Sequence, residues 1–192
     1  MEYADYLMMY KKTEPTEFPG ETNGFIFRKF DGTEKDIALW FEICRCGIIR
    51  DDETLEGAYK SRLTEHIGYN PDTIYFVLEN GVEVATVTAL TEEDGTGWLH
   101  MVTAKPEARG KGVAKYLISI AEAALYNAGM KRILLQTKEF RAVAIKAYLR
   151  AGYKPVLYTD EMESRWVAFL SEKGYSCIDA VDEDGNFIKK LN

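Results

Sequence analysis

Cysteine and histidine are scarce in this sequence of 192 residues, which contains three of the first and two of the second. Cys44 and Cys46 stand two positions apart on an expected helix, so their side chains point to different faces, and no spacing typical of a disulfide framework occurs. His66 and His100 belong to no cluster of metal ligands. We therefore expect reduced thiols, no bound metal and a cytoplasmic protein.

Long hydrophobic runs and an excess of basic residues are also missing. No stretch of about 18 apolar residues is present, as a membrane span would need, and the acidic start, residues 1–5, lacks the apolar region of a secretory signal. The formal charge of −7 provides no general basic face for nucleic-acid phosphates. We therefore expect neither a membrane-spanning helix nor a nucleic-acid partner.

Hydrophobic patterning predicts alternating strands and helices. Strands are expected at residues 24–30, 74–79, 82–90, 98–102, 133–135 and 153–157. Helices are expected from Thr33, over residues 54–66, 113–128 and 141–151, and at 161–172. Asn80-Gly81 predicts a tight hairpin, and Gly129 and Gly152 stand where helices end.

This pattern divides the chain into three parts. Residues 1–23, broken by prolines, are expected to form an irregular arm on the surface, and residues 24–157 to form the main domain. Residues 158–192 add a C-terminal helix and tail packed on the same domain, with a hairpin turn at residues 182–185.

The segment Lys105–Ala114, KPEARGKGVA, joins an expected strand to the most periodic helix. Its glycines, Gly110 and Gly112, would let main-chain N–H groups at a helix start approach an anion, although they could also simply shape a turn. The P-loop pattern fails because Lys111 is followed by glycine. The dinucleotide fingerprint fails because Lys115 replaces its third glycine and hairpins precede the segment.

A third pattern fits. Arg109-x-x-Gly112-x-Ala114, after an antiparallel strand and at the start of a helix, resembles the acetyl-coenzyme-A-binding signature of the GCN5-related N-acetyltransferases, the GNAT family. In that family, Arg/Gln-x-x-Gly-x-Gly/Ala wraps the pyrophosphate of the cofactor. Residues 141–153 are similar to the family's second motif, matching it at Ala144, Tyr148, Gly152 and Tyr153. Arg141 stands where the family often has asparagine.

The resemblance covers about residues 24–157 and implies an α+β fold: a twisted, mixed and largely antiparallel sheet with helices on both faces. The strand ending near Ala104 would part from the strand near residues 133–136 to admit the pantetheine arm. Acetyl-CoA would be the cofactor. The implied cofactor-binding residues are Val102, Ala104, Arg109, Gly110, Lys111, Gly112, Val113 and Ala114.

The resemblance also implies catalytic roles. Tyr148 would donate a proton to the leaving thiolate, since a phenol is protonated at neutral pH; without the motif it would be one tyrosine on an apolar helix face. His100 is the candidate base, directly or through water, or else a histidine of the core. Glu83 is a weaker candidate, and water alone could remove the proton.

We therefore expect an N-acetyltransferase that acetylates a small-molecule or peptide amine. The alternative is a module that binds acyl-CoA without turnover, for binding or regulation. The sequence identifies neither the acceptor nor the oligomeric state, and a homodimer stays open.

Overall fold

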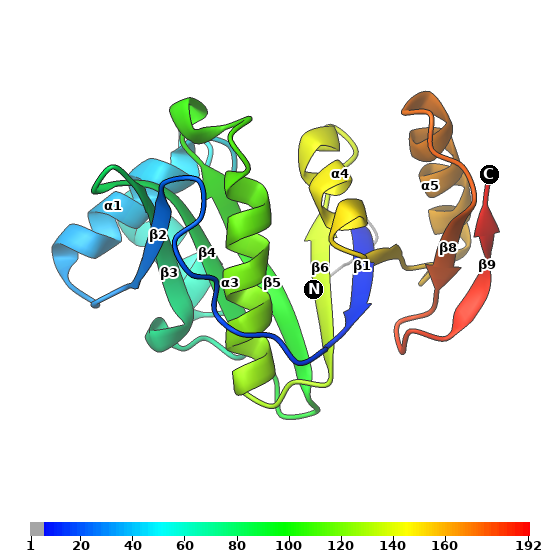
Figure 1. Cartoon of the computed structure of the whole chain (residues 1–192), viewed down its shortest axis with the longest axis horizontal. Coiled ribbons are helices and arrows are strands. Elements are labelled where there is room, and N and C mark those ends of the chain that lie inside the picture. The colour runs from blue at the N-terminus through cyan, green and yellow to red at the C-terminus, as the bar shows by residue number, and fades with distance from the viewer. Residues whose placement is uncertain (1–5) are drawn as a thin grey trace. The chain divides into compact units, whose positions relative to one another are not determined.

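In the computed structural model, residues 6–192 are described, and they fall into two compact units. One unit comprises residues 14–131, and the other comprises residues 6–13 and 132–192. Each unit combines strands with helices (Figure 1). Within each unit the strands pair in antiparallel fashion, apart from one isolated parallel bridge. The predicted α+β fold with a largely antiparallel sheet is therefore confirmed.

The unit of residues 14–131 contains an antiparallel sheet in the order β2-β3-β4-β5. Its strands are β2 (Phe25–Lys29), β3 (Ile74–Glu79), β4 (Val82–Thr91) and β5 (Thr96–Ala104). Its helices are α1 (Glu34–Arg45), α2 (Leu55–Tyr59), a π-helical turn (Lys60–Thr64), two 3-10 turns (Pro71–Thr73 and Pro106–Ala108) and α3 (Val113–Asn127). The helix predicted over residues 54–66 is thus α-helical only as far as Tyr59.

Local signals determine several boundaries in this unit. Thr33 caps α1 by accepting a hydrogen bond from the N–H of Asp36 at 3.3 Å. Asn80 and Gly81 join β3 to β4 with φ values of 52° and 80°, as the predicted hairpin requires. Gly129, with φ of 78°, follows the end of α3.

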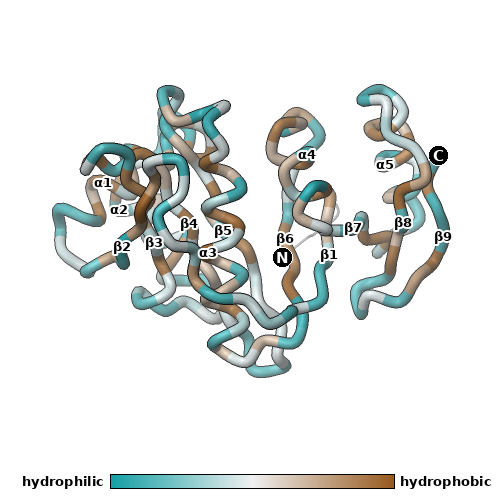
Figure 2. Tube along the Cα trace, in the orientation of Figure 1, coloured by the Kyte–Doolittle hydropathy of each residue, from teal (hydrophilic) through white to brown (hydrophobic). Residues whose placement is uncertain are grey.

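The core of this unit lies between the sheet and its helices. Its buried cluster is Phe30, Trp40, Ile43, Cys44, Ile49, Ala58, Leu63, Ile74, Phe76 and Met101. Figure 2 shows hydrophobic residues along the strands and along α3, with hydrophilic residues in many of the connecting turns. Burial of this apolar surface fixes the strands and helices that carry the loop after β5.

The other unit has a three-stranded antiparallel sheet in the order β6-β1-β7, and a separate hairpin of β8 and β9. Its elements are β1 (Leu7–Lys12), β6 (Arg132–Thr137), α4 (Ala142–Arg150), β7 (Lys154–Pro155), α5 (Asp160–Glu172), β8 (Ile178–Val181) and β9 (Phe187–Leu191). The predicted hairpin turn at residues 182–185 joins β8 to β9. A parallel bridge between Val156 and Val181 ties the C-terminal hairpin to this unit.

The expectation of an irregular surface arm at residues 1–23 is wrong for part of that range. Leu7–Lys12 form β1, which pairs with β6 along its full length, and Leu7, Met8 and Met9 are at most 1% exposed. Residues 1–5 of the predicted arm lie outside the described residues. Within the described part of that range, residues 13–21 have the expected irregular course.

The two units also divide the chain differently from the predicted domains, since residues 24–157 contribute to both. The C-terminal helix and hairpin belong to the same unit as α4. The expected parting of strands near Ala104 and Ile133 concerns one strand of each unit and stays a prediction. No helix in residues 6–192 has the length and apolar composition needed to cross a membrane.

Candidate functional site

The predicted anion-binding segment forms the turn between β5 and α3. Pro106 starts a single 3-10 turn, after which Gly110 and Gly112 both adopt the left-handed conformation, with φ of 78° and 96°. Gly112 is the N-cap of α3 and has no side chain to bond the first N–H groups of the helix. An L-residue is disfavoured at both positions, so the glycines are required by the backbone conformation itself.

The main-chain N–H groups of residues 110–115 have no hydrogen-bond acceptor within residues 6–192. The N–H of Arg109 donates to Pro106, and the next N–H that is satisfied is that of Tyr116, which donates to Gly112 at 3.3 Å. Six consecutive donors at the positive end of a 15-residue helix therefore have no acceptor among the described residues. We call the segment formed by residues 110–115 the amide cradle.

The side chain of Arg109 supports the loop that carries the amide cradle. Its guanidinium donates to the carbonyl of Ala104 from Nε at 3.1 Å and from Nη2 at 3.0 Å, and Nη2 also donates to the carbonyl of Cys46, the C-cap of α1. The side chain thus joins the end of β5 to the end of α1. In this structure Arg109 supports the loop with its side chain, and its own N–H is already used.

Two lysines of the loop between β5 and α3 form ion pairs with acidic residues of neighbouring elements. Lys111 Nζ lies 2.8 Å from a carboxylate oxygen of Glu79 on β3, and Lys105 Nζ lies 2.6 Å from Glu42 on α1. These pairs fix both ends of the loop.

Val102 and Ala104 lie on β5 with main-chain groups on the edge away from β4. The N–H of Lys105 donates to Val84 of β4 at 2.8 Å, and alternate residues of a strand direct their main-chain groups to opposite edges. The N–H groups of residues 104 and 102 therefore face away from β4. The carbonyl of Ala104 is taken by Arg109, whereas its N–H is not used within β4 and β5.

A bulge in β5 was not predicted from the sequence. The register shifts between Thr86 and Thr88 of β4, which pair with Thr103 and His100, so one more residue is accommodated in β5. Met101 adopts φ of 49°, an uncommon value for a residue with a long side chain. The bulge bends β5 just before Val102, and no Gly, Asn or Asp in the sequence marks it.

His100 is held against the π-helical turn. Its Nε2 lies 2.7 Å from the carbonyl of Arg62 and must be the donor, so Nδ1 carries the lone pair of the neutral ring. The ring of His66 lies 4.5 Å away, centroid to centroid. Burial, followed by the nearby His66, lowers the pKa of His100 to about 4. The imidazole is therefore neutral at pH 7 and is a weak base.

Glu83, the weaker candidate base, takes part in an ion-pair network. Arg28 on β2 donates from Nε to Glu83 at 2.9 Å and forms two bonds of 2.7 Å with Asp36, which is 2% exposed. Hydrogen bonds from Arg28 lower the pKa of Asp36. This network ties the start of α1 to the sheet, so Glu83 has a structural partner.

Tyr148 lies on α4, in the other unit, and is 6% exposed. Its ring packs edge-on against that of Tyr153, with centroids 5.9 Å apart. Its hydroxyl makes no hydrogen bond with any of residues 6–192. Burial raises the pKa of this hydroxyl to about 12, partly opposed by the positive charge of Arg141. The phenol is thus protonated throughout the neutral range.

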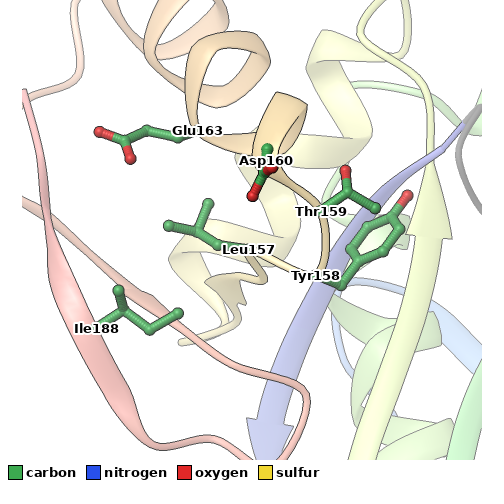
Figure 3. A pocket seen from close by; sticks show the side chains of 6 residues that line it. All are labelled: Leu157, Tyr158, Thr159, Asp160, Glu163 and Ile188. Carbon is green, nitrogen blue, oxygen red and sulfur yellow. The ribbon is translucent and has the colours of Figure 1, made fainter.

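A separate hollow lies near the start of α5 and is lined by Leu157, Tyr158, Thr159, Asp160, Glu163 and Ile188 (Figure 3). The carboxylate of Glu163 pairs with Lys189 at 2.8 Å, and the hydroxyl of Tyr158 donates to the carbonyl of Tyr6. None of the residues predicted for the site lines this hollow.

Comparison with known protein families agrees with the family resemblance inferred from the two sequence motifs. The family model described as "Acetyltransferase (GNAT) family" matches residues 40–153, more than half of the chain and a range that includes the cradle and α4. No protein of curated function matches the sequence significantly.

Three solved structures share the fold at low identity. A GCN5-related N-acetyltransferase from Sphaerobacter thermophilus has a TM-score of 0.63 and 23% identity, over 78% of this chain and 48% of that chain. The ribosomal-protein-S18-alanine N-acetyltransferase from Escherichia coli has values of 0.54 and 16%, over 67% and 76%. The NatC complex bound to Gag peptide and CoA has values of 0.55 and 17%, over 66% and 82%. This chain spans about half the length of the first of these proteins.

Proposed function

Because this chain belongs to the GNAT family of acetyltransferases, whose general reaction moves an acetyl group from acetyl-CoA to an amine, we propose that it binds acetyl-CoA at the amide cradle and acetylates a small-molecule or peptide amine. The observation that carries the proposal is the run of six N–H groups at residues 110–115 that have no acceptor within residues 6–192. A diphosphate at a helix N-terminus is stabilised both by such donors and by the helix dipole.

Val102 would bind the pantetheine arm through its main-chain groups, and Ala104 would bind it through its N–H, since Arg109 occupies the carbonyl of Ala104. Those groups lie on the edge of β5 that faces away from β4, as an added strand would require. The N–H groups of β5 near the bulge at Met101 would also polarise the thioester carbonyl, because oxyanion charge develops there as the amine attacks.

Tyr148 would serve the leaving group. As the C–N bond forms and the C–S bond breaks, negative charge moves to sulfur, and a phenol hydroxyl can stabilise that charge by donating a hydrogen bond. With a pKa of about 12 for Tyr148, and an ordinary thiol near 8.5, the phenol does not stay ionised. Tyr148 therefore gives its proton to the thiolate of CoA. It then regains a proton that the amine releases as the amide forms.

His100 remains the candidate base, and its lone pair is on Nδ1. A base whose conjugate acid has a pKa of about 4 can accept a proton only briefly and must pass it to water. Its contribution to the rate is therefore expected to be smaller than that of Tyr148.

The test combines binding with turnover. CoA is titrated into the protein by calorimetry, and thiol release from acetyl-CoA is then followed with a panel of small amines, peptides with free N-termini and lysine peptides. We expect CoA to bind and at least one class of amine to be acetylated, with loss of turnover in Tyr148→Phe.

A module that binds acyl-CoA without turnover is the alternative. CoA binding with no thiol release across the panel, unchanged in Tyr148→Phe, would favour it. Absence of CoA binding would remove the proposal and the alternative together.

A further inference from the structure

The segment that precedes β2 places one side chain at the amide cradle. Asn23 Nδ2 lies 3.6 Å from the point that a β-carbon on Gly112 would occupy. Gly112 is the N-cap of α3, so the carboxamide nitrogen of Asn23 lies beside the residue at which the helix begins. Asn23 makes no hydrogen bond with any of residues 6–192, and it is exposed.

A tight turn holds Asn23 in this position. Thr22 and Phe25 exchange two main-chain hydrogen bonds of 3.1 and 2.9 Å, and the two residues between them have positive φ, 53° at Asn23 and 77° at Gly24. These are the features of a type I′ turn, which favours the sequence Asn-Gly. The turn thus fixes the backbone from which the carboxamide projects.

Aromatic contacts fix the turn to the helix. The hydroxyl of Tyr116, on the first turn of α3, donates to the carbonyl of Gly20 at 3.1 Å. The rings of Tyr116 and Phe25 have centroids 6.0 Å apart. Farther back, Phe18 stacks on Phe27 of β2 at 5.3 Å. The segment therefore runs beside α3 into β2, as Figure 1 shows, and it is anchored on both sides of Asn23.

We propose that Asn23 is an additional cofactor-binding residue, whose side-chain N–H donates to the diphosphate held by the amide cradle. The inference rests on the proposed function, because it takes the anion to be the diphosphate of CoA. It gives a role to part of the N-terminal segment, which lies outside both motifs. An amide is suited to this position, since it donates to an anion without adding a charge that Glu79 or Glu42 could neutralise.

The test uses substitutions that keep the turn. Asn23→Gly removes the carboxamide while favouring positive φ, and Asn23→Asp retains the shape but places a carboxylate beside the diphosphate. We expect CoA affinity, measured by calorimetry, to fall about five- to ten-fold in Asn23→Gly and further in Asn23→Asp, because hydrogen bonds to charged groups are among the stronger ones. Asn80→Gly is the matched control, since Asn80 occupies the same place in the other Asn-Gly turn and should leave CoA affinity unchanged.

Two further measurements separate this role from other effects. Pantetheine, which lacks the diphosphate, is titrated at millimolar concentration, and its affinity should be the same for wild type and Asn23→Gly. Thermal melts should show that both variants remain folded. Equal CoA affinity in wild type and Asn23→Gly, or equal losses for CoA and pantetheine, would overturn the role of Asn23 while leaving the proposed function intact. Failure of wild type to bind CoA would instead overturn the proposed function and this inference with it.

Discussion

The amide cradle at the start of α3 and the tyrosine on α4 would contribute to one reaction in different ways. At residues 110–115 the groups proposed to bind CoA are main-chain donors, and their positions depend on the positive φ of Gly110 and Gly112. On α4 the group proposed to act is a single hydroxyl, that of Tyr148. A main-chain site tolerates changes of side chain but not of backbone conformation, whereas a side-chain site is lost with one atom. Substitutions in the two regions should therefore change different kinetic constants.

The largest effect is expected from Tyr148→Phe. The change removes only the hydroxyl and keeps the ring that packs against Tyr153, so kcat should fall about 100-fold or more while KM for acetyl-CoA stays the same, as for loss of a general acid. Steady-state kinetics with a fixed amine acceptor measures both constants. Tyr126→Phe, at a tyrosine that is 40% exposed, is the control and should behave as wild type. A kcat within a factor of three of wild type would show that Tyr148 is not the acid.

Gly112→Ala should produce the opposite pattern. An alanine at φ of 96° costs about 1–2 kcal/mol, and relaxation of the backbone would turn N–H groups away from the diphosphate. We expect KM for acetyl-CoA to rise about ten-fold with little change in kcat. Kinetics and CoA calorimetry together would distinguish this outcome from a general loss of activity.

Gly129→Ala provides a matched control at the other end of the same helix. Gly129 has φ of 78° and open space around it, so the alanine has a similar backbone cost there. Both variants should therefore lose similar thermal stability, but only Gly112→Ala should lose CoA affinity. Equal effects on affinity would mean that the cradle responds to the stability of α3 and not to its own conformation.

Local sequence patterns predicted most of this fold. The hairpin at Asn80-Gly81 and the glycine at position 129 were predicted because a few neighbouring residues determine each of them. The strand Leu7–Lys12 was missed because its stability comes from pairing with β6 and β7, at least 120 residues later in the chain. The sequence of this strand, a short apolar run followed by two lysines, does not indicate which strands it pairs with.

In the candidate site, too, local sequence determines some features and distant contacts determine others. The glycines of the cradle and Tyr148 could be proposed for the site from the sequence because they belong to sequence motifs, and their roles stay predictions. The bulge at Met101 could not, since it depends on the register between β4 and β5. Asn23-Gly24 carries a recognisable turn signal, but its position beside Gly112 depends on the contacts that fix the segment to α3.

His100→Gln tests whether the unit that carries the cradle also supplies side-chain chemistry. Glutamine can still donate to the carbonyl of Arg62, so the change removes the titratable ring while keeping the bond to the π-helical turn. If His100 is the base, kcat at pH 7 should fall about ten-fold. This loss is smaller than the rate contribution usual for a general base, because His100 is a weak base. An unchanged kcat would leave the histidine with a structural role and assign proton removal to water.

The same variant should alter stability in acid. The pKa of His100 is about 4 in the folded protein, below its ordinary value of 6.5, so between these pH values the unfolded chain binds more protons. The free energy of unfolding should therefore decrease as pH falls from about 6.5 to 4, and above 6.5 the contribution of His100 should be fully present. Urea unfolding at pH 7 and pH 4.5 should show a smaller decrease in His100→Gln, by about 2 kcal/mol.

The smallest effect is expected from Arg109→Lys. This substitution combines features of the two regions, because here a side chain supports a site formed by main-chain groups. The guanidinium reaches the carbonyls of Ala104 and Cys46 together, and a lysine ammonium cannot reproduce that planar geometry. We expect KM for acetyl-CoA to rise about three- to five-fold, with kcat unchanged and about 1 kcal/mol lost from stability.

If Arg109 instead bound a phosphate by its charge, lysine would largely replace it, and the effect on CoA affinity would depend on salt concentration. Calorimetry of CoA binding at low and high salt separates these roles, because a brace made of hydrogen bonds to two carbonyls predicts the same loss of affinity at both.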